Sequence, residues 1–360
     1  TEVESDTLMA CGEALARSFL LGQEGYRRIQ GRPSPVLWIP DVFGYCASLP
    51  QIMLQTGVDY FFTTKLTWSN INRFPYSSFI WRGNDGSEVL VHVTQENGYN
   101  QVVSSEELRR GARAYRQSDV HDEFLAPTGY GDGGGGVTEE MCERARRVQS
   151  LAGLPEVGWG RVEDFFKRLD KKRDKLPKYQ GELYLEYHRG VLTTHGDLKA
   201  CFRATERALQ IWEAVRCSTS GAAIAGDIWR RLVFAQFHDY IPGSSIWEVY
   251  EEGLAELKAI TENALASSAR ELTQKGGKPG FFNPLPIERI TLTANGEKAV
   301  RLGPLSGGPE SGLSVVEVSG GVTASARSLK SALVSAAFDG KGQISALSFA
   351  GGTIPVRGPL

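Results

Sequence analysis

The segment around Asp41 places a carboxylate between an apolar run and a tight turn. Residues 36–39 are apolar, Pro40 precedes Asp41, and Gly44 follows three positions later. A carboxylate in such a place can be a nucleophile, a metal ligand or both. It can equally cap the next turn, and the spacing alone does not separate these two interpretations.

A second carboxylate, Asp132, lies inside the glycine cluster 129–136. The cluster formally matches the dinucleotide pattern G-x-G-x-x-G, but glycine-rich stretches produce that match by chance. An acid beside a pyrophosphate would also be unfavourable. Alternatively, the glycines let the backbone approach a sugar while Asp132 serves as a general acid and base. The structural alternative is a flexible loop with a solvated carboxylate.

The third segment, 236–245, contains His238 and Asp239 at the end of the apolar helical pattern 228–237. Imidazole and carboxylate together suit a borderline metal such as zinc. A histidine at a helix end is more often packed against a carbonyl group, so a structural role is the leading alternative. The remaining histidines show no metal-binding spacing and are interpreted as structural or exposed, with His195 a candidate for the wall of a site: His92, His121, His188 and His195.

Aromatic residues gather near these three segments. Their rings could stack on the apolar faces of a sugar, although such residues are at least as often part of a core. The two that we take as candidate sugar contacts are Trp38 and Tyr130.

Short apolar runs alternate with helical patterns in the first half of the chain. This alternation predicts a parallel sheet with crossover helices. In such sheets ligands bind at the carboxyl ends of the strands, where Asp41, Lys65 and Asp132 are expected to lie. The expected strands are 36–39, 59–63, 89–93 and 122–127, and the expected helices are 13–29, 49–56 and 139–151.

Three regions of different character divide the chain. We predict a β/α barrel-like domain over 1–180, a helical bundle over 181–275 and the start of a β-sandwich over 276–360. The charge run 167–178 is interpreted as a solvated helix face and linker. Helices are expected at 198–215, 222–237 and 246–272, and strand-like runs at 290–293, 313–316 and 331–338.

Composition places the chain among globular proteins. Hydrophobic residues make up 41% and charged residues 23% of its 360 residues, which excludes a disordered or collagen-like protein. A net charge of -2 argues against nucleic acid or an anionic membrane as a partner, and no apolar run approaches the ~20 residues that cross a bilayer. The five cysteines contain no C-x-x-C pair, and an odd number cannot all pair within the chain. This favours a reducing compartment, and we expect a cytoplasmic location.

Taken together and in order, these segments resemble the α-mannosidases of glycoside hydrolase family 38. The resemblance rests on 38–45, 49–51, 64–68, 79–81, 85–87, 131–136, 181–186, 237–239 and 283–286. The four glycines after Asp132 and the Leu49-Pro50-Gln51 turn are similar to the cytosolic and bacterial branch.

The resemblance implies hydrolysis of terminal α-linked mannose from oligosaccharides, with retention of configuration. Asp41 would be the nucleophile and a metal ligand, and Asp132 the acid/base. His238 would be a second metal ligand, while Asp239 and Lys65 would contact the sugar. One divalent metal is implied, zinc or alternatively cobalt, bound between the protein and the sugar hydroxyls.

The chain departs from the family pattern at its N-terminus. The family takes two further metal ligands from a His-x-Asp pair, and no such pair occurs in 1–35. Because the sequence has no initiator Met and no signal-peptide pattern, we expect it to be a fragment. Because the ligand pair is missing, we expect this fragment by itself neither to bind metal tightly nor to turn over. The alternatives are a metal-dependent carbohydrate deacetylase, a non-catalytic carbohydrate-binding relative and a dinucleotide-binding enzyme. The sequence leaves a homo-oligomer open.

Overall fold

Two compact units make up the chain. The computed structural model describes residues 1–360 apart from 70, 95–97, 133, 225, 275–279, 294–295, 297, 318–320 and 357–360. Gly133 of the glycine cluster and the predicted change of composition at 275–277 therefore lie outside the described residues. The first unit contains residues 1–213 and 223–267, and the second contains 214–222 and 268–360. The predicted division into three domains stays a prediction.

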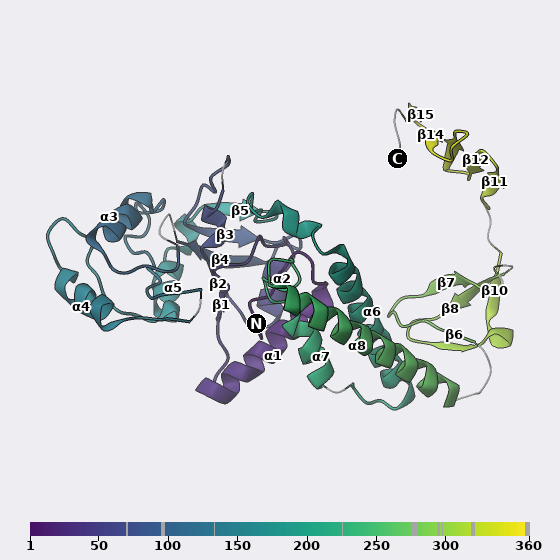
Figure 1. Ribbon diagram of the computed structural model, residues 1–360, viewed down its shortest axis with the longest axis horizontal. Coiled ribbons are helices and arrows are strands. Elements are labelled where there is room, and N and C mark those ends of the chain that lie inside the picture. The colour runs from purple at the N-terminus through teal and green to yellow at the C-terminus, as the bar shows by residue number, and fades with distance from the viewer. Residues whose placement is uncertain are drawn as a thin grey trace. The chain divides into compact units, whose positions relative to one another are not determined.

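A five-stranded sheet forms the centre of the first unit (Figure 1). Its strands β1, β2 and β4 are mutually parallel, as predicted, while β3 pairs antiparallel with β4 and parallel with β5. Within the described residues β1 and β5 do not pair, so the sheet is open and a closed barrel is not confirmed. In sheet order, the strands are β1 (Val36–Trp38), β2 (Tyr60–Thr63), β4 (Glu88–Val93), β3 (Ser78–Arg82) and β5 (Lys178–Gln180).

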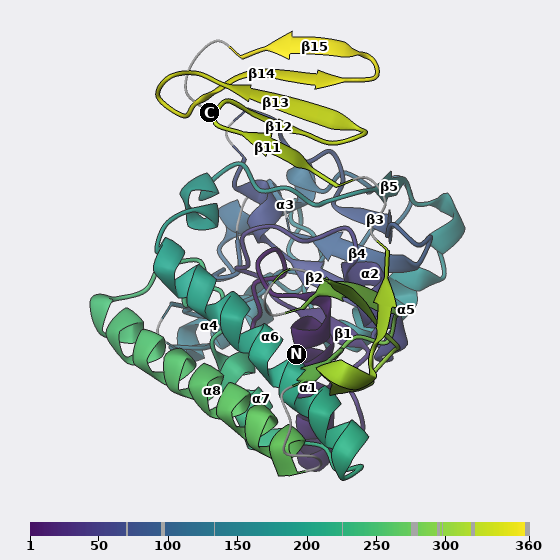
Figure 2. The same ribbon diagram turned by 90° about the vertical axis from the view of Figure 1, so that its right-hand side faces the viewer.

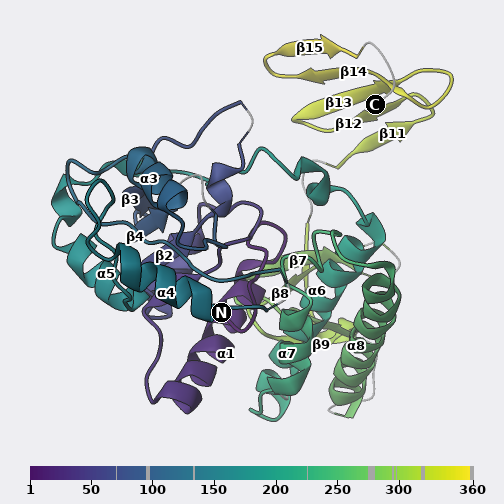
Figure 3. The ribbon, with the colours of Figure 1, turned by 60° about the vertical axis from the view of Figure 1, so that its left-hand side comes forward.

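Helices cover both faces of this sheet, because successive residues of a strand point to opposite sides. On one face, Phe61 packs in the core that contains α1 (Gly12–Gln30) and α2 (Leu49–Gln55). On the other face, Phe62 packs against α5 (Val162–Asp170), which Figure 3 shows beside the strands. Burial on both sides explains why these strands read as continuous apolar runs.

One predicted strand is wrong, and one observed strand was not predicted. Residues 122–127 form no strand in the structure. The backbone N–H of Leu125 donates to the His92 side chain instead of a neighbouring strand, and Pro127 has no N–H to donate. Conversely, β3 was not predicted, although the Asp85-Gly86 turn that follows it is a hairpin signal and Gly86 has a φ of 89°.

A second core lies between the long helices of the first unit. Leu15 of α1 belongs to this core and Phe19 to the sheet core, so α1 joins the two. The predicted middle helices are confirmed as α6 (Gly196–Thr219), α7 (Gly226–Phe234) and α8 (Trp247–Gln274). The remaining helices of this unit are α3 (Ser105–Ala114), α4 (Glu139–Val148), η1 (Lys65–Thr67), η2 (Arg173–Lys175) and η3 (Arg189–Leu192).

The second unit is built mainly from short antiparallel strands. The predicted strands near 290, 314 and 334 are confirmed as β7 (Arg289–Leu292), β10 (Ser314–Val316) and β13 (Val334–Phe338). β11 to β15 follow one another as a meander, seen in Figure 2. A β-sandwich stays a prediction. The other elements are β6 (Gly280–Phe282), β8 (Ala299–Leu302), β9 (Gly307–Pro309), η4 (Glu310–Gly312), β11 (Thr323–Ser325), β12 (Ser328–Lys330), β14 (Ile344–Phe349) and β15 (Gly352–Pro355).

Neither a membrane-spanning helix nor a disulfide is present in the described part of the chain. No helix there combines the length and the apolar character needed to cross a bilayer. All five cysteines are free thiols. The cytoplasmic location stays a prediction, because neither observation tests it.

Candidate functional site

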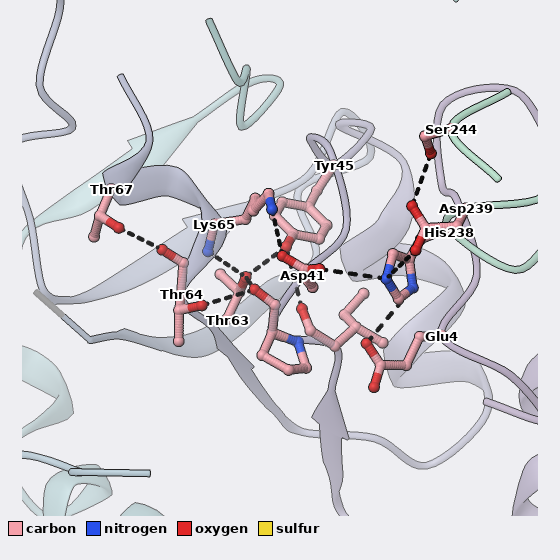
Figure 4. Close-up of polar contacts among 12 residues, drawn as sticks. Glu4, Asp41, Tyr45, Thr63, Thr64, Lys65, Thr67, His238, Asp239 and Ser244 are labelled. Atoms are coloured by element: carbon pink, nitrogen blue, oxygen red, sulfur yellow. Dashed lines mark hydrogen bonds and ion pairs between the residues drawn. The ribbon is translucent and has the colours of Figure 1, made fainter. Parts of the chain in front are cut away.

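The carboxyl ends of β1 and β2 bring Asp41 and Lys65 together. The carbonyl oxygen of Pro40 accepts hydrogen bonds from the backbone N–H groups of Thr64 at 3.2 Å and Lys65 at 3.0 Å. It also accepts one from the Thr64 hydroxyl at 2.9 Å. These bonds tie the two strand ends, and Lys65 Nζ forms an ion pair with Asp41 Oδ1 (Figure 4).

The turn after Asp41 is held by a glycine and a buried phenol. Gly44 has a φ of 109°, a conformation that side chains with a Cβ rarely adopt. The hydroxyl of Tyr45 donates to the Ile39 carbonyl at 3.2 Å and contacts the hydroxyl of Thr63. Because Tyr45 is fully buried, these bonds fix the turn against the sheet and thereby the position of Asp41.

His238 brings the helical part of the unit to this strand end. It lies in the turn after α7, and its Nε2 is 3.5 Å from Asp41 Oδ2 and 3.6 Å from Asp239 Oδ2. On the opposite side of the ring, Nδ1 is 3.8 Å from Glu4 Oε2. Three carboxylates therefore surround one imidazole, and Ser244 donates to Asp239 Oδ1 at 2.7 Å.

Neighbouring charges favour the charged forms of both Asp41 and His238. Burial is the largest single influence on the pKa of Asp41 and raises it. Hydrogen bonds from His238, Lys65 and Tyr99, together with the charge of Lys65, outweigh burial, so the pKa lies below its ordinary value. Burial likewise opposes the charged form of His238, yet Asp41, Asp239 and Glu4 together raise the pKa of the imidazole. The arrangement thus favours an ionised Asp41.

Aromatic rings enclose the Lys65 ammonium. Nζ is 3.8 Å from the ring centroid of Trp68 and 5.1 Å from that of Phe43, distances at which the ring faces stabilise a cation. His188 packs against both rings, at 5.8 Å from Trp68 and 4.7 Å from Phe43. Sequence reasoning missed Phe43, two residues after Asp41. The sequence analysis interpreted His188 as structural or exposed. Its backbone has a left-handed φ of 65°, and nothing in the sequence predicts this conformation at a histidine.

Asp132 lies in an exposed loop that closes on itself. Tyr130 and Gly136 exchange two backbone hydrogen bonds of 2.8 Å, and Asp132 has a φ of 49°. A Cβ on Gly129 would stand 2.8 Å from the backbone of Gly136, so this glycine serves the close approach of the loop's own backbone. No strand directly precedes the loop in the described residues, so it lacks the strand–turn–helix context of a dinucleotide site.

The structure thus brings together four of the predicted site residues: Asp41, Lys65, His238 and Asp239. Asp132 makes no hydrogen bond or ion pair with them in the described part of the chain. Its charge helps raise the pKa of Tyr99, after burial and Asp41, and the Tyr99 phenol interacts with Asp41. The sequence analysis did not single out Tyr99 as a site residue.

The two predicted sugar-stacking residues lie outside this group of four. Trp38 is partly exposed and stacks on Phe62 with ring centroids 4.0 Å apart. Tyr130 is exposed on the glycine loop. Both rings remain accessible to a ligand.

A cavity of about 600 Å³ opens beside Trp68. A space of this size holds a small-molecule ligand. It shares Trp68 with the ring cluster around Lys65, so it adjoins the site. Its polar lining includes Arg73, Arg110, Arg116 and Tyr187.

A divalent metal fits part of this donor set. Two ligands about 2.1 Å from zinc in tetrahedral geometry stand about 3.4 Å apart, and Asp41 Oδ2 and His238 Nε2 are separated by 3.5 Å. The surrounding carboxylates supply negative charge that a dication would offset. Within the described residues, no group of three or more His, Cys, Asp or Glu side chains is placed to hold a metal ion. Asp41 and His238 therefore fit as two ligands of an incomplete set.

Comparison with known proteins defines the family. Residues 1–182 match the sequence model of the glycosyl hydrolases family 38 N-terminal domain. Residues 186–274 match that of the alpha mannosidase middle domain. The chain belongs to glycosyl hydrolase family 38. Both regions contribute to the site: Asp41, Lys65 and Asp132 lie in the first, and His238 and Asp239 in the second.

Individual relatives agree with this assignment. Alpha-mannosidase 2C1 of Homo sapiens is 37% identical over 311 residues, which cover 82% of this chain and 30% of that protein. The alpha-mannosidase of Saccharomyces cerevisiae is 36% identical over 269 residues, which cover 70% of this chain and 25% of that protein. The chain thus spans less than a third of the length of these curated relatives.

The fold is also similar to a solved structure. An alpha-mannosidase from Enterococcus faecalis V583 superimposes with a TM-score of 0.72 at 15% identity, covering 98% of this chain and 52% of that chain. At this identity the likeness concerns the fold, which is mixed α/β.

Proposed function

We propose that this protein is a retaining exo-α-mannosidase that releases terminal α-linked mannose from oligosaccharides. The observation that carries the proposal is the carboxylate of Asp41 at a strand end, paired with Lys65 and facing His238. Membership of family 38 and the names of the relatives support the substrate class. The proposal includes a barrel-like catalytic domain and a cytoplasmic location, both of which stay predictions.

Asp41 would attack the anomeric carbon and form a covalent glycosyl-enzyme. A carboxylate has about four lone-pair sites, so its contacts with Lys65, His238 and Tyr99 leave a lone pair for the anomeric carbon. The pKa of Asp41 is lowered, which keeps the attacking group ionised. Lys65 holds the carboxylate in place and Asp239, fixed by Ser244, would accept hydrogen bonds from sugar hydroxyls.

Asp132 would transfer the proton in both steps. Retaining glycosidases use a second carboxyl group that protonates the leaving oxygen and then removes a proton from the incoming water. In the first step Asp132 gives its proton to the oxygen of the departing sugar. In the second it takes one from water, which releases mannose and restores both carboxyl groups. Trp38 and Tyr130 would stack on the substrate.

Asp41 and His238 would hold a divalent metal, zinc or alternatively cobalt, as two of its ligands. A bound dication orients sugar hydroxyls and offsets the charge of the carboxylates.

The test is hydrolysis of 4-nitrophenyl α-mannoside by the full-length protein, before and after chelation and with zinc or cobalt restored. Activity that falls on chelation and returns with metal is the expected result, and NMR should show the α-anomer of mannose as the first product. No activity with any metal would contradict the proposal. Acetate release from acetylated sugars would then indicate a deacetylase, and sugar binding without turnover a non-catalytic relative.

A further inference from the structure

A carboxylate near the N-terminus faces the second nitrogen of His238. Glu4 Oε2 and His238 Nδ1 are 3.8 Å apart. Both atoms are buried, and neither has a hydrogen-bond partner among the described residues. Buried polar atoms without a partner are uncommon in folded proteins and call for an explanation. Here the two unpaired atoms are a possible acceptor and a possible donor that face each other.

Backbone pairing, and not the side chains, holds Glu4 opposite His238. The His238 N–H donates to the Glu4 carbonyl at 3.0 Å, and the Asp6 N–H donates to the Gln236 carbonyl at 2.7 Å. Between these bonds, Ser5 and Phe237 form an antiparallel bridge. The short extended segment 4–6 therefore runs beside the turn that carries His238, so a change of the Glu4 side chain leaves this pairing intact.

Glu4 faces one nitrogen of the imidazole, Nδ1, while Asp41 and Asp239 face the other, Nε2. In a neutral histidine, the hydrogen bond made by one ring nitrogen sets the tautomer of the other. Without a metal, Nε2 lies 3.5 and 3.6 Å from Asp41 and Asp239 and donates to Asp41. A metal bound at Nε2 would take the place of that proton, and a carboxylate facing Nδ1 would then hold the remaining proton there. Metal-binding histidines commonly donate their other N–H to a carboxylate in this way.

We propose that Glu4 is a positioning residue, which orients His238 through Nδ1 so that Nε2 and Asp41 are presented to a divalent metal. This inference rests on the proposed function. The 3.8 Å separation between Glu4 Oε2 and His238 Nδ1 is longer than a hydrogen bond. Hydrogen bonds in active sites are often long before the ligand binds and shorten in the complex.

Zinc affinity of the full-length protein tests the inference, measured by competition with a chelating indicator. Glu4→Gln keeps an acceptor oxygen but loses the charge, whereas Glu4→Leu loses both. We expect about 10-fold weaker zinc binding for Glu4→Gln and about 100-fold weaker binding for Glu4→Leu. Excess zinc should restore hydrolysis in both variants, a rescue that a merely structural role of Glu4 would not produce.

Glu206→Gln is the matched control. Glu206 is a fully buried carboxylate outside the site, which accepts from the Cys11 N–H at 2.7 Å, and its loss should leave zinc affinity unchanged. If both Glu4 variants bind zinc as tightly as the unsubstituted protein and hydrolyse mannosides equally well, the inference fails and the proposed function stands. If the unsubstituted protein binds no zinc, both fail. Should Glu4→Leu not fold, Glu4→Gln decides alone, because it preserves volume.

Discussion

Lys65 and Asp41 form an ion pair across the ends of two adjacent parallel strands, and the ammonium lies 3.8 Å from the ring centroid of Trp68. Lys65 is only 3% exposed, so its charge has been removed from water and depends on these partners. Breaking a buried pair leaves an uncompensated charge, which costs more than the pair contributes. This relationship has consequences for both stability and turnover.

Replacing Lys65 by Met should destabilise the protein by about 3 kcal/mol, the range for removing one partner of a buried pair. Turnover should fall as well, because Asp41 loses the group that holds it. Thermal unfolding and the rate of 4-nitrophenyl mannoside hydrolysis measure the two effects. Lys167→Met is the control, since Lys167 is exposed and its 3.8 Å pair with Asp164 lies on the surface. Equal effects of the two substitutions would contradict this role of Lys65.

The two candidate catalytic carboxylates should respond differently to the leaving group. Asp41→Ala should abolish hydrolysis of every mannoside, because no nucleophile remains. Asp132→Ala should slow cleavage of a mannosyl–mannose bond by about 10²- to 10⁴-fold, the usual contribution of a general acid. It should slow 4-nitrophenyl mannoside much less, since nitrophenolate leaves without protonation. Initial rates on both substrates test this, and equal losses for Asp132→Ala would argue against an acid role.

A methyl group at Gly44 should disturb the turn that positions Asp41. A Cβ there would lie 3.2 Å from Leu8 and 3.4 Å from the Leu183 carbonyl, at a φ of 109°. Gly57→Ala is a matched control, because Gly57 also has a positive φ of 77° but nothing within 4 Å of its Cβ position. We expect both variants to lose about 1–2 kcal/mol of stability, and only Gly44→Ala to lose activity as well. An active Gly44→Ala enzyme would show that the turn is not critical.

His92 should make stability depend on pH. Burial, and secondarily the charge of His121, lowers the pKa of His92 to about 3, whereas an unfolded histidine titrates near 6.5. Between these values the unfolded state binds a proton that the folded state refuses. The free energy of unfolding therefore falls as pH decreases below 6.5, by about 1.4 kcal/mol per pH unit for this one group.

Denaturant unfolding at pH 6 and pH 5 measures this dependence. His92→Gln should remove most of this slope, since the amide does not titrate in this range. Ser78, whose hydroxyl is 2.9 Å from His92 Nδ1, would remain to bond the amide. An unchanged slope in His92→Gln would mean that other groups cause the pH dependence.

Local patterns in the sequence determined the elements that carry the chemistry. Apolar runs at 36–39 and 59–63 predicted the strands β1 and β2, because strands buried on both faces must be continuously apolar. The residues after these runs, Asp41 and Lys65, were therefore expected at one edge of a sheet, where the structure has them. His238 could be placed at the end of a helix for the same local reason. Its proposed role as a metal ligand was favoured over a structural role only by the family resemblance.

Only the tertiary structure decided how these elements meet. Glu4, Asp41 and His238 are far apart in the chain, and no periodicity relates them. Backbone bonds join segment 4–6 to the turn after α7, and the Thr7 hydroxyl donates to the Gly44 carbonyl in the turn after Asp41. The antiparallel direction of β3 and the unpaired course of 122–127 likewise depend on hydrogen-bond partners elsewhere in the fold. Propensity and period act over a few residues, whereas ion pairs and hydrogen bonds between distant segments form only when the cores that hold those segments are packed.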